Sequence, residues 1–253
     1  NRSVELIDLP GTYSLSPRTL DEMVSVEVLL GRQKDVGDID AVVCIVDASN
    51  LERNLYLVSQ VLDLGLPTIL VLNMWDVAQT RHVSIDVEGL RQRLGMPVIV
   101  CEAHRRMGVD DVRRAIVHSD TLAPAPRPRP FVEEFYTECS QLEETLRELG
   151  ETRTPFYLVE RLLLDVNGQV ETSLTERHNG KLTSQLTEAR DRLRAIGCRV
   201  PIVEAKSRYA WAKETLDGIV TVPRTRVKTR SDRLDGILTH RFAGLLFFAA
   251  VMF

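Results

Sequence analysis

Apolar and polar positions form a repeating pattern over the first half of the chain. Four short apolar runs lie at 4–7, 41–46, 68–72 and 98–100, and amphipathic stretches of helix length separate them. This alternation of strand and helix signals is typical of an α/β fold with a parallel sheet. The two middle runs are continuously apolar and rich in β-branched residues, as expected of strands that are buried on both faces.

Each apolar run leads into a polar residue, and these residues are Asp8, Asp47, Asn73 and Glu102. In open α/β sheets, ligands bind in the crevice at the carboxyl ends of the strands. We therefore expect the functional side chains to gather at that edge of the sheet.

Helices are expected between and after the strands, over 20–30, 54–64, 86–94 and 109–117. Glycine follows directly after each of the first three, as is common where a helix ends. These elements define an α/β domain over 1–120.

The second half of the chain has a different character. Proline occupies every second position from 124 to 130, which favours extended backbone and predicts a linker over 121–130. Helical periodicity then dominates, with acidic and basic residues on the outer faces, and it predicts a small all-helical domain over 131–222. Its expected helices lie at 131–149, 156–165, 182–196 and 204–216.

The C-terminal residues 242–253 are uninterrupted, uncharged and apolar. A membrane span needs about 20 such residues, so this run predicts the start of a first transmembrane helix that contacts membrane lipid. The segment 223–241 before it is basic, as expected at the cytoplasmic side of a membrane entry. The alternative is a basic helix followed by a buried C-terminal tail. The residues that make the segment basic are Arg224, Arg226, Lys228, Arg230, Arg233, His240 and Arg241, against Asp232 and Asp235.

Composition narrows the classes of partner. The chain has 32 basic and 36 acidic residues and a net charge of -4, so no global field favours nucleic acid, and we expect no nucleic-acid partner. The four cysteines form no Cys-x-x-Cys pair. They favour buried thiols in a reducing compartment over a structural zinc site.

The first candidate site is Asp8-Leu9-Pro10-Gly11, followed by Thr12, after the first apolar run. In P-loop nucleotide triphosphatases, an Asp-x-x-Gly at this place puts the Asp near the magnesium ion, often through water, and the Gly amide near the terminal phosphate. A carboxylate suits a hard dication, and glycine lets the backbone approach a phosphate. The motif alone is weak, since Asp followed by Pro-Gly is also an ordinary turn.

The second candidate site is Asn73-Met74-Trp75-Asp76, which matches the guanine-reading pattern Asn-(Lys or Met)-x-Asp. The Asp76 carboxylate would accept two hydrogen bonds from the ring nitrogen and the exocyclic amine of guanine, and adenine cannot supply these donors. The Asn73 amide would brace the neighbouring loops. The alternative is that both are polar loop residues after a buried strand.

The order and spacing of the motifs strengthen both interpretations. One strand and two helices separate Asp8 from Asn73, and a loop of the form Ala-x-x-x-x-Gly follows the last strand. This order predicts the second half of a GTPase domain. The loop would place Ala103, His104 and Arg105 beside the base, where backbone amides read the carbonyl oxygen. An exposed loop histidine is favoured over a catalytic base at His104, and no catalytic residue is assigned.

Several stretches resemble the ferrous iron transport protein B family. The most specific are DLPGTYSL at 8–15 and VDASNLERNLYL at 46–57, and Leu-Asp-Glu at 20–22, Asn-Met-Trp-Asp at 73–76 and the Arg-Phe-x-Gly-Leu entry at 241–245 also fit. The resemblance implies a P-loop GTPase-like, mostly parallel sheet whose N-terminal part lies before Asn1, a helical spacer domain and a first membrane span.

The resemblance also implies a function. The chain would be the cytoplasmic regulatory part of a GTP-dependent Fe(II) transporter at the inner face of a bacterial cell membrane. GTP or GDP and Mg²⁺ would be its cofactors, K⁺ dependence and homo-oligomerisation stay open, and Fe(II) would pass through a membrane part outside this sequence. Residues 11–16 would belong to the second switch loop. Thr12 would stand where Ras-like GTPases carry a glutamine, so hydrolysis should be slow.

Two departures from the family pattern matter. Residues 1–253 contain no Gly-x-x-x-x-Gly-Lys-Ser/Thr loop, and Ala103 stands where the family usually has serine. We therefore expect this chain to bind nucleotide weakly and not to hydrolyse it. The competing interpretations are a soluble GTPase of another class, such as a ribosome or RNA factor, and a non-enzymatic remnant.

Overall fold

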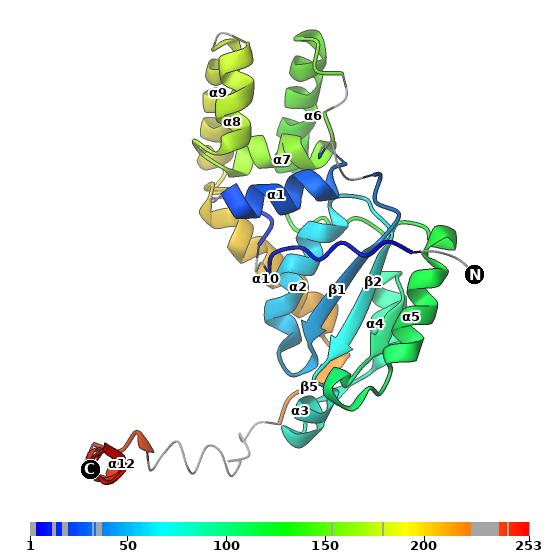
Figure 1. Cartoon of the computed structure of the whole chain (residues 1–253). Helices are drawn as coiled ribbons and strands as arrows, with labels where there is room; N and C mark the ends of the chain where they lie inside the picture. The colour runs from blue at the N-terminus through cyan, green and yellow to red at the C-terminus, as the bar shows by residue number, and fades with distance from the viewer. Residues whose placement is uncertain are drawn as a thin grey trace.

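The computed structural model describes residues 4–11, 14–16, 20–31, 33, 37–152, 154–178, 180–223, 238–241 and 243–252. Its main sheet has three parallel strands, β1 (Val42–Asp47), β2 (Thr68–Asn73) and β4 (Val98–Val100), in the order β1-β2-β4. The predicted parallel α/β sheet is confirmed. In the register, Asp47 lies opposite Asn73 and Leu72 lies opposite Val100, so the strand ends meet at one edge (Figure 1).

The first apolar run, 4–7, was expected to be a strand, and this expectation is wrong. Residues 4–10 belong to no strand, and Leu6 is 73% exposed. An extended segment becomes a strand only when a neighbouring strand pairs with its backbone groups, and β-branched composition cannot supply that neighbour.

The helices of the first half follow the predicted order. They are α1 (Leu20–Leu29), α2 (Leu51–Leu62), α3 (Trp75–Thr80), α4 (Val87–Leu94) and α5 (Val109–Val117). Helix α2 begins three residues before the predicted start, and α3 was not predicted. A short antiparallel pair, β3 (Ser84–Ile85) with β5 (Val220–Thr221), joins this half to the second.

Helices cover both faces of β2. Leu70 and Leu72 pack into the larger core with α2, α4 and α10 (Ile202–Leu216), while Ile69 and Val71 pack on the other face against residues of α5. Burial on both faces is therefore confirmed for β2. The same prediction is wrong for β1, where Ile45 is 67% exposed. Helix α5 packs against β2 and leaves this face of β1 uncovered at Ile45.

Four helices of the second half form a separate core. They are α6 (Glu133–Glu148), α7 (Phe156–Leu164), α8 (Gln169–Arg177) and α9 (Lys181–Ala195), and they stand together at one end of the molecule in Figure 1. Helix α10 instead packs along α2, and its Ala212 and Leu216 belong to the larger core. The second half is thus anchored to the α/β half through α10.

A buried polar network fills the junction between the two halves. Arg208 of α10 is fully buried and donates hydrogen bonds to Asp63 Oδ2 (2.6 Å), Glu204 Oε1 (2.9 Å) and Ser59 Oγ (3.0 Å). Arg161 of α7, also buried, donates to Glu204 Oε1 (2.6 Å). The expectation that charged residues of these helices face solvent is wrong here, because each buried charge has an opposite charge within hydrogen-bond distance.

The network reaches the segment that follows Gly11. The backbone amide of Leu15 donates to Gln60 Oε1 (2.8 Å), and Arg161 contacts the Ser16 hydroxyl. Gln60 in turn donates to Glu204 Oε1 (2.8 Å). Residues 14–16 are therefore tied to α2, α7 and α10.

The C-terminal prediction is not confirmed. Residues 243–252 form helix α12 (Ala243–Met252), and among the described residues no helix is both long enough and apolar enough to cross a membrane. Most of the basic segment 223–241 lies outside the described residues.

All four cysteines are free and buried, as predicted. Burial raises the pKa of the Cys44 thiol to about 12, so this group stays protonated at neutral pH.

Candidate functional site

The candidate site lies at the carboxyl ends of β2 and β4. Asn73 is the last residue of β2, and its Oδ1 accepts a hydrogen bond from the backbone amide of Ala103 (3.1 Å). Ala103 begins the loop that follows β4. The Asn73 side chain thus holds two loops together across the sheet edge.

The chain turns sharply after Asn73. Met74 has a left-handed backbone (φ 57°), and the amide of Trp75 points to the carbonyl of Cys101 (3.4 Å) as α3 begins. This turn puts Asp76 in the first turn of α3, next to the loop after β4. Met74 is exposed and Trp75 packs partly against the larger core.

The two carboxylate oxygens of Asp76 have different surroundings. Oδ1 is buried and has no hydrogen-bond partner, whereas Oδ2 lies 3.6 Å from His104 Nε2. A buried acceptor without a donor costs free energy, about 1–3 kcal/mol. The site is therefore suited to a ligand that brings N–H donors to this carboxylate.

The loop after β4 has a defined conformation. Glu102 is buried, its amide donates to the carbonyl of Met107 (3.0 Å), and its carboxylate pairs with Arg105 (3.2 Å). Gly108 has φ 77°, and a Cβ there would lie 2.1 Å from the carbonyl oxygen of Val100, so only glycine fits. Sequence reasoning missed the role of Glu102 in shaping this loop, although its place after a strand was noted.

The first candidate motif lies apart from this cluster. Asp8, Pro10 and Gly11 are exposed, and Leu9 packs partly against the larger core. Asp8 forms no hydrogen bond or ion pair with any other residue that the structure describes. Thr12 lies outside the described residues. The structure thus brings together Asn73, Asp76 and residues 103–105, and does not join the Asp8 motif to them.

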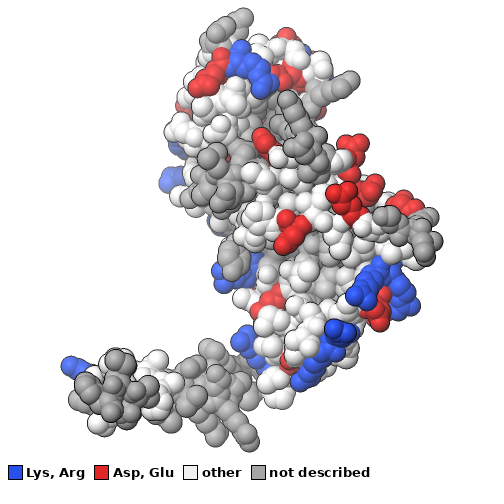
Figure 2. Space-filling model, viewed as in Figure 1, with Lys and Arg blue, Asp and Glu red and all other residues white. Residues whose placement is uncertain are grey.

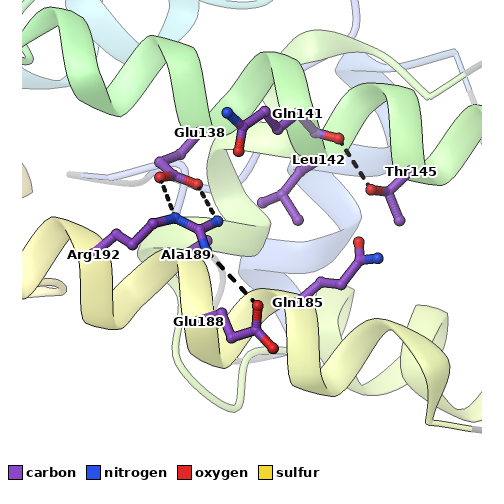
Figure 3. A pocket seen from close by; sticks show the side chains of 8 residues that line it. All are labelled: Glu138, Gln141, Leu142, Thr145, Gln185, Glu188, Ala189 and Arg192. Atoms are coloured by element: carbon purple, nitrogen blue, oxygen red, sulfur yellow. Dashed lines mark hydrogen bonds and ion pairs between the residues drawn. The ribbon is translucent and has the colours of Figure 1, made fainter.

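Other surface features are distinct from the site. Figure 2 shows acidic side chains gathered at the right-hand edge of the face in view, with basic side chains below them. A polar cleft of about 260 Å³ lies between α6 and α9, where Glu138 accepts two hydrogen bonds from Arg192 (2.7 and 2.8 Å), with Glu188 on the other side of the guanidinium (Figure 3). Its charged groups pair with one another.

Comparison with known proteins relates the chain to a family. The family described as ferrous iron transport protein B matches residues 1–116. The Fe(2+) transporter FeoB of Salmonella typhimurium strain LT2 is 32% identical over 263 aligned residues, which cover all of this chain and 32% of that protein. Over residues 1–116, the chain is thus similar to the ferrous iron transport protein B family. The resemblance inferred from the motifs is thereby confirmed.

A second relative gives the same picture. The FeoB transporter of Escherichia coli K12 is 30% identical over 260 residues, again across the whole chain and 32% of that protein. The chain thus spans about a third of the length of these curated relatives.

Solved structures confirm the GTPase-like fold. The cytosolic domain of L. pneumophila FeoB has a TM-score of 0.68 at 26% identity and covers 85% of this chain and 79% of that one. A GDP-bound variant of the S. thermophilus FeoB G-domain has a TM-score of 0.68 at 26% identity, with 85% and 80% covered. A GDP-bound variant of S. thermophilus NFeoB has a TM-score of 0.67 at 28% identity, with the same coverage.

Proposed function

We propose that this chain is the cytoplasmic, guanine-nucleotide-binding regulatory part of a GTP-dependent Fe(II) transporter. The observation that carries the proposal is the buried, unpartnered Oδ1 of Asp76, held beside the loop that Asn73 fixes. Both oxygens of this carboxylate would accept the two N–H donors of guanine. The relatives named as Fe(2+) transporters and the GDP-bound neighbours support the same function.

We assign roles to the other predicted residues on this basis. Met74 and Trp75 shape the turn that presents Asp76, and the backbone of Ala103, His104 and Arg105 lies beside the base. In the first motif, Asp8 would approach magnesium through water and the Gly11 amide would face the terminal phosphate, with Leu9, Pro10 and Thr12 in the same nucleotide-binding loop.

The carboxylate of Asp8 is a suitable ligand for magnesium. Mg²⁺ commonly takes one or two carboxylates together with waters and substrate phosphates, so a single exposed carboxylate is sufficient from the protein. When bound, the ion would neutralise phosphate charge, and Asp8 would hold one of its waters. The proposal also includes contact of residues 242–253 with membrane lipid. Dependence on K⁺ and self-association are left open in it.

Replacing Asp76 with asparagine should shift base preference from guanine to xanthine. The asparagine amide donates to the second carbonyl of xanthine, where guanine carries an amine. We expect the ratio of GDP to XDP affinities to fall about 30-fold, which corresponds to about 2 kcal/mol for a charge-assisted hydrogen bond. Titration of the 253-residue chain with each nucleotide, followed in ¹H–¹⁵N spectra, measures the ratio.

A matched control uses Asp110→Asn, because the Asp110 side chain is 87% exposed and lies on α5. Its nucleotide preference should equal that of the unmodified chain. An unchanged preference in Asp76→Asn would remove Asp76 from the base site.

Phosphate release from GTP by the purified 253-residue chain should equal the rate without protein. Residues 1–253 carry no Gly-x-x-x-x-Gly-Lys-Ser/Thr loop to hold the phosphates, so positioning for hydrolysis lacks its main contacts. A time course of released phosphate measures this. Turnover above the blank would show that other residues of the chain suffice.

A further inference from the structure

His104 lies against the carboxylate that the proposed function assigns to the base. Its Nε2 is 3.6 Å from Asp76 Oδ2, and the other oxygen, Oδ1, is the buried and unpartnered one. The histidine side chain is 59% exposed and that of Asp76 is 25% exposed. The imidazole therefore stands on the solvent side of the pair, where a base would approach.

The backbone around His104 is well fixed. It belongs to the short 3-10 helix Ala103–Arg105, which the Asn73–Ala103 hydrogen bond (3.1 Å) ties to the end of β2. The amide of Arg105 donates to the carbonyl of Glu102 (2.9 Å). The approach of the imidazole to Asp76 thus follows from the loop conformation.

Two of the other charged groups near this loop have partners of their own. Arg105 pairs with Glu102 on the same loop, and Arg81, which follows directly after α3, donates to Ser49 Oγ (2.9 Å). Arg106 follows on the loop with a left-handed backbone and an exposed side chain. Among the described residues, Asp76 is the only carboxylate within ion-pair distance of His104.

We propose that His104 is a positioning residue that competes with the base for Asp76 and makes guanine-nucleotide affinity depend on pH. The proposal rests on the proposed function. Histidine is the side chain whose charge ordinarily changes between pH 5 and 8. In the charged form, the imidazolium attracts the carboxylate and must be displaced before guanine can use both oxygens. In the neutral form, this attraction is lost and the carboxylate is free for the base.

The test compares three versions of the 253-residue chain with GDP as the probe at pH 5.8 and 8.0. The unmodified chain should bind GDP about two- to fivefold more tightly at pH 8.0, the range expected for a partly exposed ion pair. Apart from the pH effect on GDP itself, which all versions share, His104→Gln is neutral throughout and should keep the tighter affinity at both pH values. His104→Lys, which is charged throughout, should keep the weaker affinity at both.

The Gln and Lys variants also serve as controls for the ligand. The terminal phosphate of GDP gains a proton in the same range, but it does so equally with every version of the chain. A purely structural role of His104 would shift all affinities together and leave the three pH profiles parallel.

Parallel profiles, or tighter binding by the unmodified chain at pH 5.8, would overturn the inference. If no version bound GDP at either pH, the proposed function itself would fail. Binding by all three versions with equal pH dependence would leave the proposed function in place and remove only the role of His104.

Discussion

Replacing Arg208 with alanine should lower the free energy of unfolding by about 3–5 kcal/mol, the usual loss when one partner of a buried ion pair is removed. The Arg208 guanidinium is fully buried and donates to Asp63 Oδ2 (2.6 Å) and Glu204 Oε1 (2.9 Å). Without it, the ion-pair partner that Asp63 keeps among the described residues is the Arg127 guanidinium, whose Nε lies 3.5 Å from Asp63 Oδ1. Urea denaturation of the 253-residue chain measures the change.

Two further variants identify the cause. Arg113→Ala removes an arginine whose side chain is 74% exposed and that pairs with Asp110 at 3.3 Å, and it should cost less than about 1 kcal/mol. Arg208→Met keeps most of the apolar stem and removes the guanidinium with its charge and its hydrogen bonds. If Arg208→Met were as stable as the unmodified chain, packing rather than charge would explain the alanine result.

Neither this network nor its position could be read from the sequence. Helical periodicity places charged residues of an amphipathic helix on its outer face, and it predicts this for the acidic and basic residues of the helices 156–165 and 204–216. Asp63, a partner of Arg208, is 145 residues away in sequence and lies at the end of another helix. Only the packing of α10 along α2 brings such distant charges together.

The elements of the α/β half were more predictable. The buried strand 68–72 and the C-terminal ends of α2 and α4 lie within a few residues of their predicted positions. Apolar runs and the glycines that follow helices are local signals, so the sequence reveals them directly. The segment 4–7 has the same local signal, yet it forms no strand. Strand formation also needs a partner, which no local pattern reveals.

The candidate site was predictable in its motif but not in its contacts. The Asn-x-x-Asp spacing indicated that Asn73 would brace a neighbouring loop, and the contact from Ala103 (3.1 Å) agrees with that expectation. The approach of His104 to Asp76 depends on the left-handed turn at Met74 and on the 3-10 helix after β4. These backbone details do not follow from residue spacing.

The stability of the chain should fall as the pH rises from about 4.5 to about 7, and ionisation of the buried Glu160 carboxyl contributes to this fall, as does the neighbouring Asp63, whose pKa burial also raises. Burial raises the pKa of the Glu160 carboxyl to about 7, with a further contribution from Asp63, and this outweighs the opposing effect of Arg127, which pairs with Glu160 at 2.6 Å. Between these pH values, the unfolded chain releases the proton and the folded chain keeps it. The loss for this group amounts to about 3 kcal/mol by pH 7 and is absent below pH 4.5.

Glu204 has the opposite behaviour and lies outside this pH window. Arg161 and Arg208 lower the pKa of the Glu204 carboxyl to about 2 despite its burial. Its stabilising contribution is therefore complete above about pH 4.5 and is lost only as the pH falls towards 2. Measurements between pH 5 and 8 separate the two groups.

Glu160→Gln should isolate the effect, because glutamine imitates the protonated carboxyl at every pH. At pH 8, the variant should be more stable than the unmodified chain by about 3 kcal/mol, and at pH 5 the difference should shrink to below about 1 kcal/mol. Urea denaturation midpoints at both pH values measure this, with Glu133→Gln, whose side chain is 79% exposed, as the control that should change little. Equal pH dependence of Glu160→Gln and the unmodified chain would contradict the assignment, since a buried carboxyl whose proton is held by the fold must lose its influence when it can no longer ionise.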